Sequence, residues 1–136
     1  MNKQRRDKFY GQTVEEWIEK IPGELPIDAV GLWQIVSFGR EGFELSGEEL
    51  VDAVRRSVAA LLAKGAVPVV GAMDGIRVWT PVKYGDTADE TTEAIIIEWR
   101  NSGRDPDVGD VWFAVPHILG ATRPQSEPRK RKEDLS

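Results

Sequence analysis

The sequence contains three helix-start signals, and these constrain its fold more than any other feature. In each signal a hydroxyl residue precedes a glutamate by three positions, as in Thr13–Glu16, Ser46–Glu49 and Thr87–Glu90. Such a pair forms a capping box, which satisfies two backbone N–H groups at the start of a helix. The sequence therefore predicts three helices that begin near these positions.

Stop signals and apolar spacing complete the helical expectation. The first helix ends before Pro22. The helix that begins near Ser46 has Leu45 and Leu50 at the two positions of a hydrophobic staple, and it ends at Lys64-Gly65. Between them a further helix is expected over Ala29–Phe38, capped by Asp28 and ended by Gly39. The helix after Thr87 closes at Gly103, and its expected buried residues are Ala88, Thr92, Ile95, Ile96 and Trp99.

The remaining segments read as strands. Val67–Gly71 and Ile76–Trp79 flank an Asp74-Gly75 turn pair, which is typical of a β-hairpin, and Pro68 and Pro81 belong at an edge or a strand end. Val108–Val115 is rich in β-branched and aromatic residues and predicts a final strand that joins the hairpin. We therefore expect an α+β fold of about four helices with a small antiparallel sheet, in an order like that of a winged helix.

Charge separates the chain into a strongly acidic domain with basic ends. Residues 11–120 carry nine basic and nineteen acidic side chains, whereas residues 1–10 and 121–136 are both net positive. We expect a flexible basic N-terminus over 1–12, one domain over 13–120 and a disordered basic tail over 121–136. A negative domain repels phosphate backbones and attracts basic surfaces, so the predicted partner is a basic protein and nucleic acid is disfavoured.

The chain lacks the residues that are characteristic of several classes of functional site. The chain has no cysteine for a thiolate site and one histidine, His117, beside Pro116; no cofactor or metal is predicted. Asp105, Asp107 and Asp110 lack the remaining ligands and glycine of a calcium loop, so a turn with solvated acids is expected. We expect no enzymatic activity, and without an apolar membrane span or secretory signal we expect a cytoplasmic protein.

Two stretches carry a family resemblance. LSGEELVDAVRRSVAALLAKGAVPVVG, followed by DETTEAIIIEWRNSGRDPDVGDVWFAVP, resembles the small bacterial immunity proteins of polymorphic and contact-dependent toxin systems, over about Leu32 to Pro116. The resemblance is one of general character and has no catalytic signature. It implies a small acidic inhibitor that covers or distorts a toxin, often a basic nuclease.

The expected contact residues follow from charge and aromatic content. They are the acids of the last helix and the following turn, with one tryptophan as an anchor: Asp89, Glu90, Glu93, Asp105, Asp107 and Trp79. The alternative function is a winged-helix DNA-binding regulator, which would depend on Arg55, Arg56, Arg77 and the basic ends.

Overall fold

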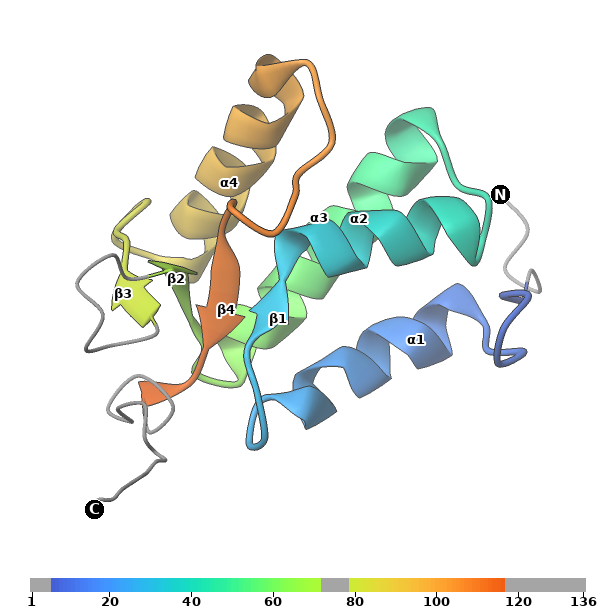
Figure 1. The fold of residues 1–136 in the computed structure, drawn as a ribbon, viewed down its shortest axis with the longest axis horizontal. Coiled ribbons are helices and arrows are strands. Elements are labelled where there is room, and N and C mark those ends of the chain that lie inside the picture. Colours follow the sequence, from blue (N-terminus) through green and yellow to red (C-terminus); the bar gives the residue numbers. More distant parts are fainter. Residues whose placement is uncertain (1–5, 72–78, 117–136) are drawn as a thin grey trace.

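The chain folds into four helices and a small antiparallel sheet, as the sequence predicts (Figure 1). The computed structural model describes residues 6–71 and 79–116. The elements in chain order are α1 (Val14–Lys20), the 3₁₀ turn η1 (Ile21–Glu24), β1 (Val30–Gly31), α2 (Leu32–Glu41), α3 (Gly47–Ala63), β2 (Val67–Gly71), β3 (Trp79–Pro81), α4 (Ala88–Ser102) and β4 (Trp112–Ala114).

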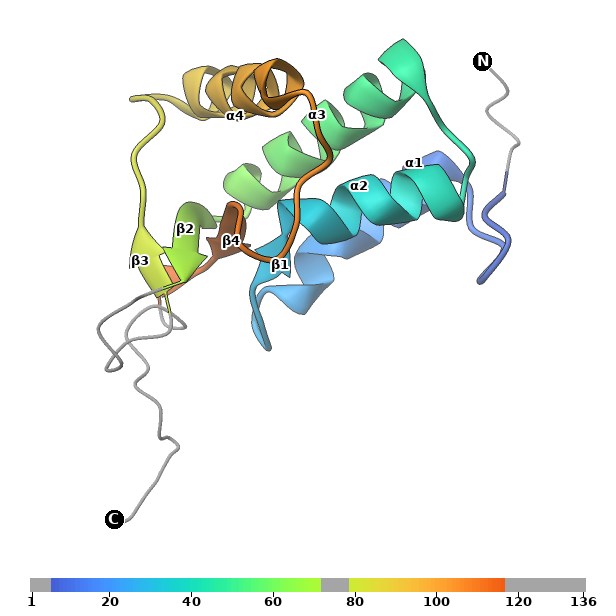
Figure 2. The same ribbon diagram turned by 45° about the horizontal axis from the view of Figure 1, so that its top comes forward.

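Helix α3 lies at the centre of the helical part. It packs against α1, α2 and α4, and Figure 2 shows it between α4 on one side and α1 with α2 on the other. Its inward residues Val54, Val58 and Leu61 are completely buried, at 0% exposure. The apolar spacing of this helix, recognised from the sequence, therefore supplies the middle of the main core.

The sheet has the strand order β1-β4-β2-β3, with every pair antiparallel. Because side chains alternate along a strand, Phe113 enters the main core while Trp112 and Ala114 face a second apolar cluster around Val69. Pro81 lies on the edge strand, as predicted. The sheet thus separates a large core from a small outer one.

The N-terminal capping box forms, but the folded structure begins before it. Thr13 and Glu16 exchange side-chain to backbone hydrogen bonds of 3.2 and 2.9 Å. Upstream, Asp7 is 4% exposed and accepts backbone N–H groups from Phe9, Tyr10 and Gln12 at 2.6–2.8 Å. Residues 6–12, expected to be a flexible end, form a turn organised by this carboxylate, while residues 1–5 and 121–136 lie outside the described residues.

The expected helix over Ala29–Phe38 is wrong at both ends. Asp28 binds its neighbour Ala29 through the backbone N–H at 2.8 Å, and the chain first makes the strand β1. The helix starts only at Leu32, and it runs through Gly39 to Glu41. A Cβ on Gly39 would lie 2.7 Å from Leu50 Cδ1, so this glycine permits close packing against α3 rather than ending the helix.

Of the other two predicted capping boxes, the one at Ser46 does not form and the one at Thr87 forms only in part. Ser46 is the residue before α3 but makes no side-chain capping bond, whereas the staple residues Leu45 and Leu50 are both buried. Thr87 accepts the Glu90 N–H at 3.1 Å, yet the Glu90 carboxylate binds Asp86 N–H instead of Thr87.

The buried side of α4 also differs at its first residue. Ala88, expected to be buried, is exposed, while Thr92, Ile95, Ile96 and Trp99 are buried as predicted. Its end at Gly103, with a left-handed φ of 73°, is confirmed.

The final strand is shorter than expected, and its start is a loop. Only Trp112–Ala114 pairs in the sheet, and it lies between β1 and β2 rather than at the end of the hairpin. Val108 is 67% exposed, because polar contacts of the loop 103–111 replace strand pairing there. The predicted turn pair Asp74-Gly75 lies outside the described residues.

Asp7 generates a prediction about acid stability. Burial raises the pKa of Asp7, but the N–H groups of Tyr10, Gln12 and Phe9 together lower it below its ordinary value. The stability from this carboxylate is therefore present above about pH 4 and is lost as the pH falls through the lowered pKa. Asp7→Asn should reduce the free energy of unfolding at pH 7 by about 1–3 kcal/mol. In urea titrations, the gap between the two proteins should narrow below pH 4; a gap independent of pH would contradict the assignment.

Gly85 generates a second stability prediction. A Cβ at Gly85 would lie 2.8 Å from Glu90 Cβ and 3.0 Å from Thr91 N, which belong to the first turn of α4. Gly85→Ala should therefore destabilise the protein by about 1–3 kcal/mol in urea unfolding. The control is Gly23→Ala, whose Cβ would meet nothing within 4 Å and which should change stability by less than about 0.5 kcal/mol. Equal effects of the two variants would refute this packing argument.

Candidate protein-interaction surface

Each arginine in the described part of the chain is held in an internal ion pair. Two of these pairs link α3 to α4: Arg55 with Glu93 at 2.7 Å and Arg100 with Glu48 at 2.7 Å. The others are Arg6–Glu16, Arg40–Asp105, Arg56–Glu15, Arg56–Asp52, Arg104–Asp107 and Arg104–Asp110. Residues 6–71 and 79–116 carry ten basic against nineteen acidic side chains, so the charge left over after pairing is negative.

Arg55 and Arg56, central to the DNA-binding alternative, are occupied in this way. Arg55 makes a bidentate contact with Glu93, whose two oxygens lie 2.7 and 3.2 Å from the guanidinium nitrogens. Arg56 binds Glu15 of α1 and lies 3.7 Å from Asp52. Arg55 ties α3 to α4 and Arg56 ties it to α1, so each guanidinium would have to give up its carboxylate partner to bind a phosphate.

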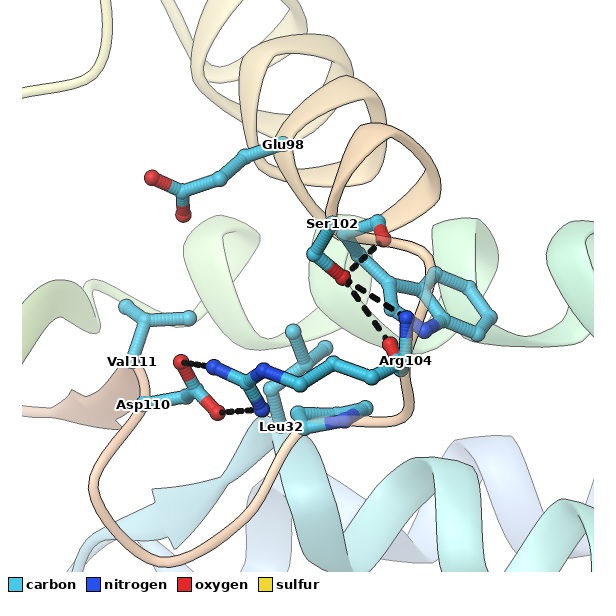
Figure 3. A pocket seen from close by; sticks show the side chains of 8 residues that line it. Leu32, Glu98, Ser102, Arg104, Asp110 and Val111 are labelled. Carbon is cyan, nitrogen blue, oxygen red and sulfur yellow. Dashed lines mark hydrogen bonds and ion pairs between the residues drawn. The ribbon is translucent and has the colours of Figure 1, made fainter.

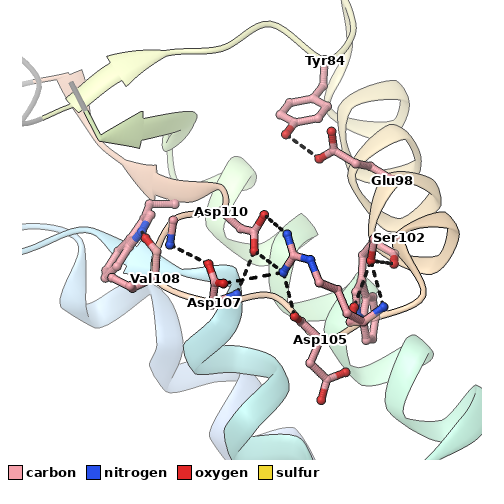
Figure 4. A network of polar contacts seen from close by, with 11 residues as sticks. Tyr84, Glu98, Ser102, Asp105, Asp107, Val108 and Asp110 are labelled. Atoms are coloured by element: carbon pink, nitrogen blue, oxygen red, sulfur yellow. Dashed lines mark hydrogen bonds and ion pairs between the residues drawn. The ribbon is translucent and has the colours of Figure 1, made fainter. Parts of the chain in front are cut away.

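All three acids of the loop 103–111 take part in internal polar contacts, and Figure 4 shows those of Asp107 and Asp110. Asp105 forms a bidentate pair with Arg40 at 2.7 and 2.9 Å, and Asp110 forms another with Arg104 at 3.0 and 3.1 Å. Asp107 Oδ1 accepts the Gly109 N–H at 2.8 Å, while its Oδ2 lies 3.8 Å from Arg104. The Asp107 side chain is the most exposed of the three, with 72% of it accessible to solvent.

A pocket of about 170 Å³ lies between the end of α4 and this loop (Figure 3). Its polar groups are already paired: Asp110 with Arg104, and Glu98 with the Tyr84 hydroxyl at 2.8 Å. Burial and this hydrogen bond raise the pKa of Tyr84 above its ordinary value. Ser102 Oγ lies 2.6 Å from the Trp99 carbonyl and thus contacts a backbone acceptor rather than a general base.

The predicted acids of α4 do not form one patch with those of the loop. Asp89 and Glu90 lie in the first turn, and Glu93 is paired with Arg55. Asp105 and Asp107 belong to the loop 103–111, where Asp105 is paired with Arg40. Among the predicted acids, Asp89 and Asp107 therefore keep exposed carboxylates on two different elements, α4 and the loop.

Trp79 belongs to an aromatic cluster that sequence reasoning did not identify. Its ring centroid lies 5.0 Å from that of Trp112 on β4, which in turn lies 6.4 Å from Trp33 at the start of α2. All three side chains are half-buried. Trp33 Nε1 is buried without a hydrogen-bond partner, at a cost of about 1–3 kcal/mol. The alternation of Trp112, Phe113 and Ala114 was the available signal, because it places Trp112 away from the main core.

Other site types receive no support from the described residues. Residues 6–71 and 79–116 contain no group of three or more His, Asp or Glu side chains placed to hold a metal ion, and no helix among them has the length and apolar character needed to cross a bilayer. His117 lies outside this part of the chain. Comparison with models of protein families, with curated proteins and with solved structures finds no match for the chain.

The loop ion pair generates a titration prediction. The hydrogen-bonded Arg104 is the main reason that the pKa of Asp110 lies below its ordinary value. Arg104→Gln should raise that pKa, as measured from the pH dependence of the Asp110 carboxyl carbon signal in NMR. Lys83→Gln, which removes the separate pair with Asp86, should leave the Asp110 titration unchanged. An unshifted Asp110 pKa in the Arg104 variant would show that the bidentate pair does not persist in solution.

Proposed function

We propose that this chain is a non-catalytic protein-binding module that neutralises a basic partner, such as a toxin domain, by covering its surface in the manner of an immunity protein. The observation that carries the proposal is the internal pairing of every described arginine, together with the excess of acids. A surface of this kind attracts cationic proteins over long range and discourages phosphate. The resemblance to small bacterial immunity proteins points in the same direction.

Inhibition in this scheme is steric and electrostatic. Exposed carboxylates without a cation partner among the described residues, such as Glu24, Glu41 and Asp89, steer the encounter, and exposed aromatic surface excludes water from the final contact. Long-range steering of this type weakens as salt screens the charges. The proposal therefore requires fast association at low ionic strength and slower association at high ionic strength.

The DNA-binding alternative has weaker support. In its favour, the order α1-β1-α2-α3-β2-β3 places three helices before a β-ribbon. Against it, α3 packs between its neighbours, and both of its arginines are occupied by carboxylates. A phosphate-binding role would have to break these pairs and overcome the net negative charge.

A charge-variant experiment tests the proposal. The tagged full chain is used to isolate its partner from a lysate of the producing cells at low salt, and the association rate is then measured by stopped flow. The triple variant Glu24→Gln/Glu41→Gln/Asp89→Asn should slow association about tenfold at low salt and little at high salt. One equivalent of the chain should also abolish the activity of the partner.

The matched control changes charge in the opposite direction. Lys20 and Lys64 are exposed and form no ion pair among the described residues, so Lys20→Gln/Lys64→Gln makes the surface more negative. This variant should speed association with a basic partner. Association rates that are unchanged in both variants would contradict the proposal, and so would recovery of DNA as the bound species.

A further inference from the structure

Three tryptophans from distant parts of the sequence form one aromatic surface beside the outer face of the sheet. We call Trp33, Trp79 and Trp112 the tryptophan platform. The Trp79 and Trp112 rings are tilted by 43°, and Trp33 meets Trp112 edge-on at 68°. All three residues are half-buried. Trp17 and Trp99, in contrast, are buried in the main core.

The platform is held on rigid backbone. A Cβ on Gly31 would lie 2.8 Å from Trp33 Cδ1 and 3.1 Å from Trp112 Cδ2, so both indoles pack directly over strand β1. Trp112 Nε1 donates a hydrogen bond of 2.9 Å to the Val108 carbonyl, which fixes its ring against the loop 103–111. Aromatic groups fixed before binding lose little conformational entropy when a partner arrives.

The loop that contacts this platform also carries an exposed carboxylate. Asp107 directly precedes Val108, the residue that accepts the Trp112 hydrogen bond, and Figure 4 shows both residues in the same turn of the loop. Asp107 Oδ1 is used by Gly109 N–H, but its Oδ2 has only the 3.8 Å contact with Arg104. Asp107 therefore keeps an exposed oxygen in the loop segment whose next residue, Val108, contacts Trp112.

We propose that the tryptophan platform and Asp107 together bind an arginine side chain of the basic partner; this inference rests on the proposed function. An indole face attracts a cation, and a planar guanidinium can stack on it while donating hydrogen bonds to a carboxylate in its plane. Strand β3 forms the neighbouring sheet edge and is three residues long, and Pro81 removes one of its N–H groups, which makes this edge a poor template for an added strand.

The charge of the platform's surroundings favours a protein cation over nucleic acid. Bases also stack on tryptophan, but they arrive with phosphates. In the adjacent loop Asp105 pairs with Arg40 and Asp110 pairs with Arg104, so the exposed Asp107 leaves a net negative charge there. Phosphate is therefore repelled from this surface, whereas a guanidinium is attracted to it.

The probe for this site is a synthetic nine-residue peptide of alternating glycine and arginine, added to the ¹⁵N-labelled full chain at low salt. The five indole N–H signals in NMR report on each tryptophan separately. The signals of Trp33, Trp79 and Trp112 should shift together, while those of Trp17 and Trp99 should not. A peptide with citrulline in place of arginine keeps the side-chain shape without the charge, and it should not bind.

Variants separate the platform from general charge attraction. Trp79→Leu should weaken peptide binding about five- to tenfold, and Asp107→Asn about threefold or more. Asn at position 107 retains an oxygen for the Gly109 N–H, so the loop can keep its turn. Asp89→Asn removes the same charge from the first turn of α4, outside this loop, and should change binding less than about twofold.

The outcomes distinguish this inference from the proposed function. If Asp89→Asn and Asp107→Asn weaken binding equally and no platform signal moves, the platform assignment is overturned while a basic partner still stands. If the citrulline peptide or a single-stranded oligothymidine moves the same signals, recognition is by stacking and the arginine site is refuted. If the arginine peptide fails to bind at low salt, and the isolation from lysate also yields no basic protein, the inference and the proposed function fall together.

Discussion

The close packing of α2 on α3 is the contact on which the rest of the structure depends. Gly39 and Leu50 meet there with no room for a Cβ, and the buried face of α3 continues from that point to α1 and α4. Because three helices share one central partner, their positions are coupled through a single close-packed core. The sheet joins this core through Phe113, which is 0% exposed. The surface features therefore rest on a rigid interior.

The electrostatics of the molecule follow from the same arrangement. Helices that pack on one central helix bring their flanking side chains within reach of each other. The arginines of α3 and α4 therefore form ion pairs with carboxylates on the neighbouring helices. Each exposed pair contributes little to stability, at about 0–1 kcal/mol. In the proposed function their larger effect is on recognition, because they occupy the guanidinium groups at the surface and leave acids such as Asp89 and Asp107 exposed.

The sequence predicted the helices better than their contacts. Local signals sufficed where the chain itself supplies both partners, as in the capping box of Thr13 with Glu16. They misled at Gly39, where a helix-ending residue serves a contact with Leu50, eleven positions away. The role of Glu93 and Asp105 was also hidden, since their arginine partners lie 38 and 65 residues away. Trp79 was singled out as an anchor for a partner, which stays a prediction, and its companions Trp33 and Trp112 depend on strand order, which no short window of sequence contains.

The place of β4 in the sheet has a consequence for how the protein is made. This strand follows every other described element in the chain, yet it pairs with β1 on one side and β2 on the other. During synthesis from the N-terminus, β1 has no strand to pair with until residues 112–114 have left the ribosome. The helices can collapse around α3 earlier, but the sheet closes last, so the nascent chain exposes the unpaired edges of β1 and β2 until its final strand inserts between them.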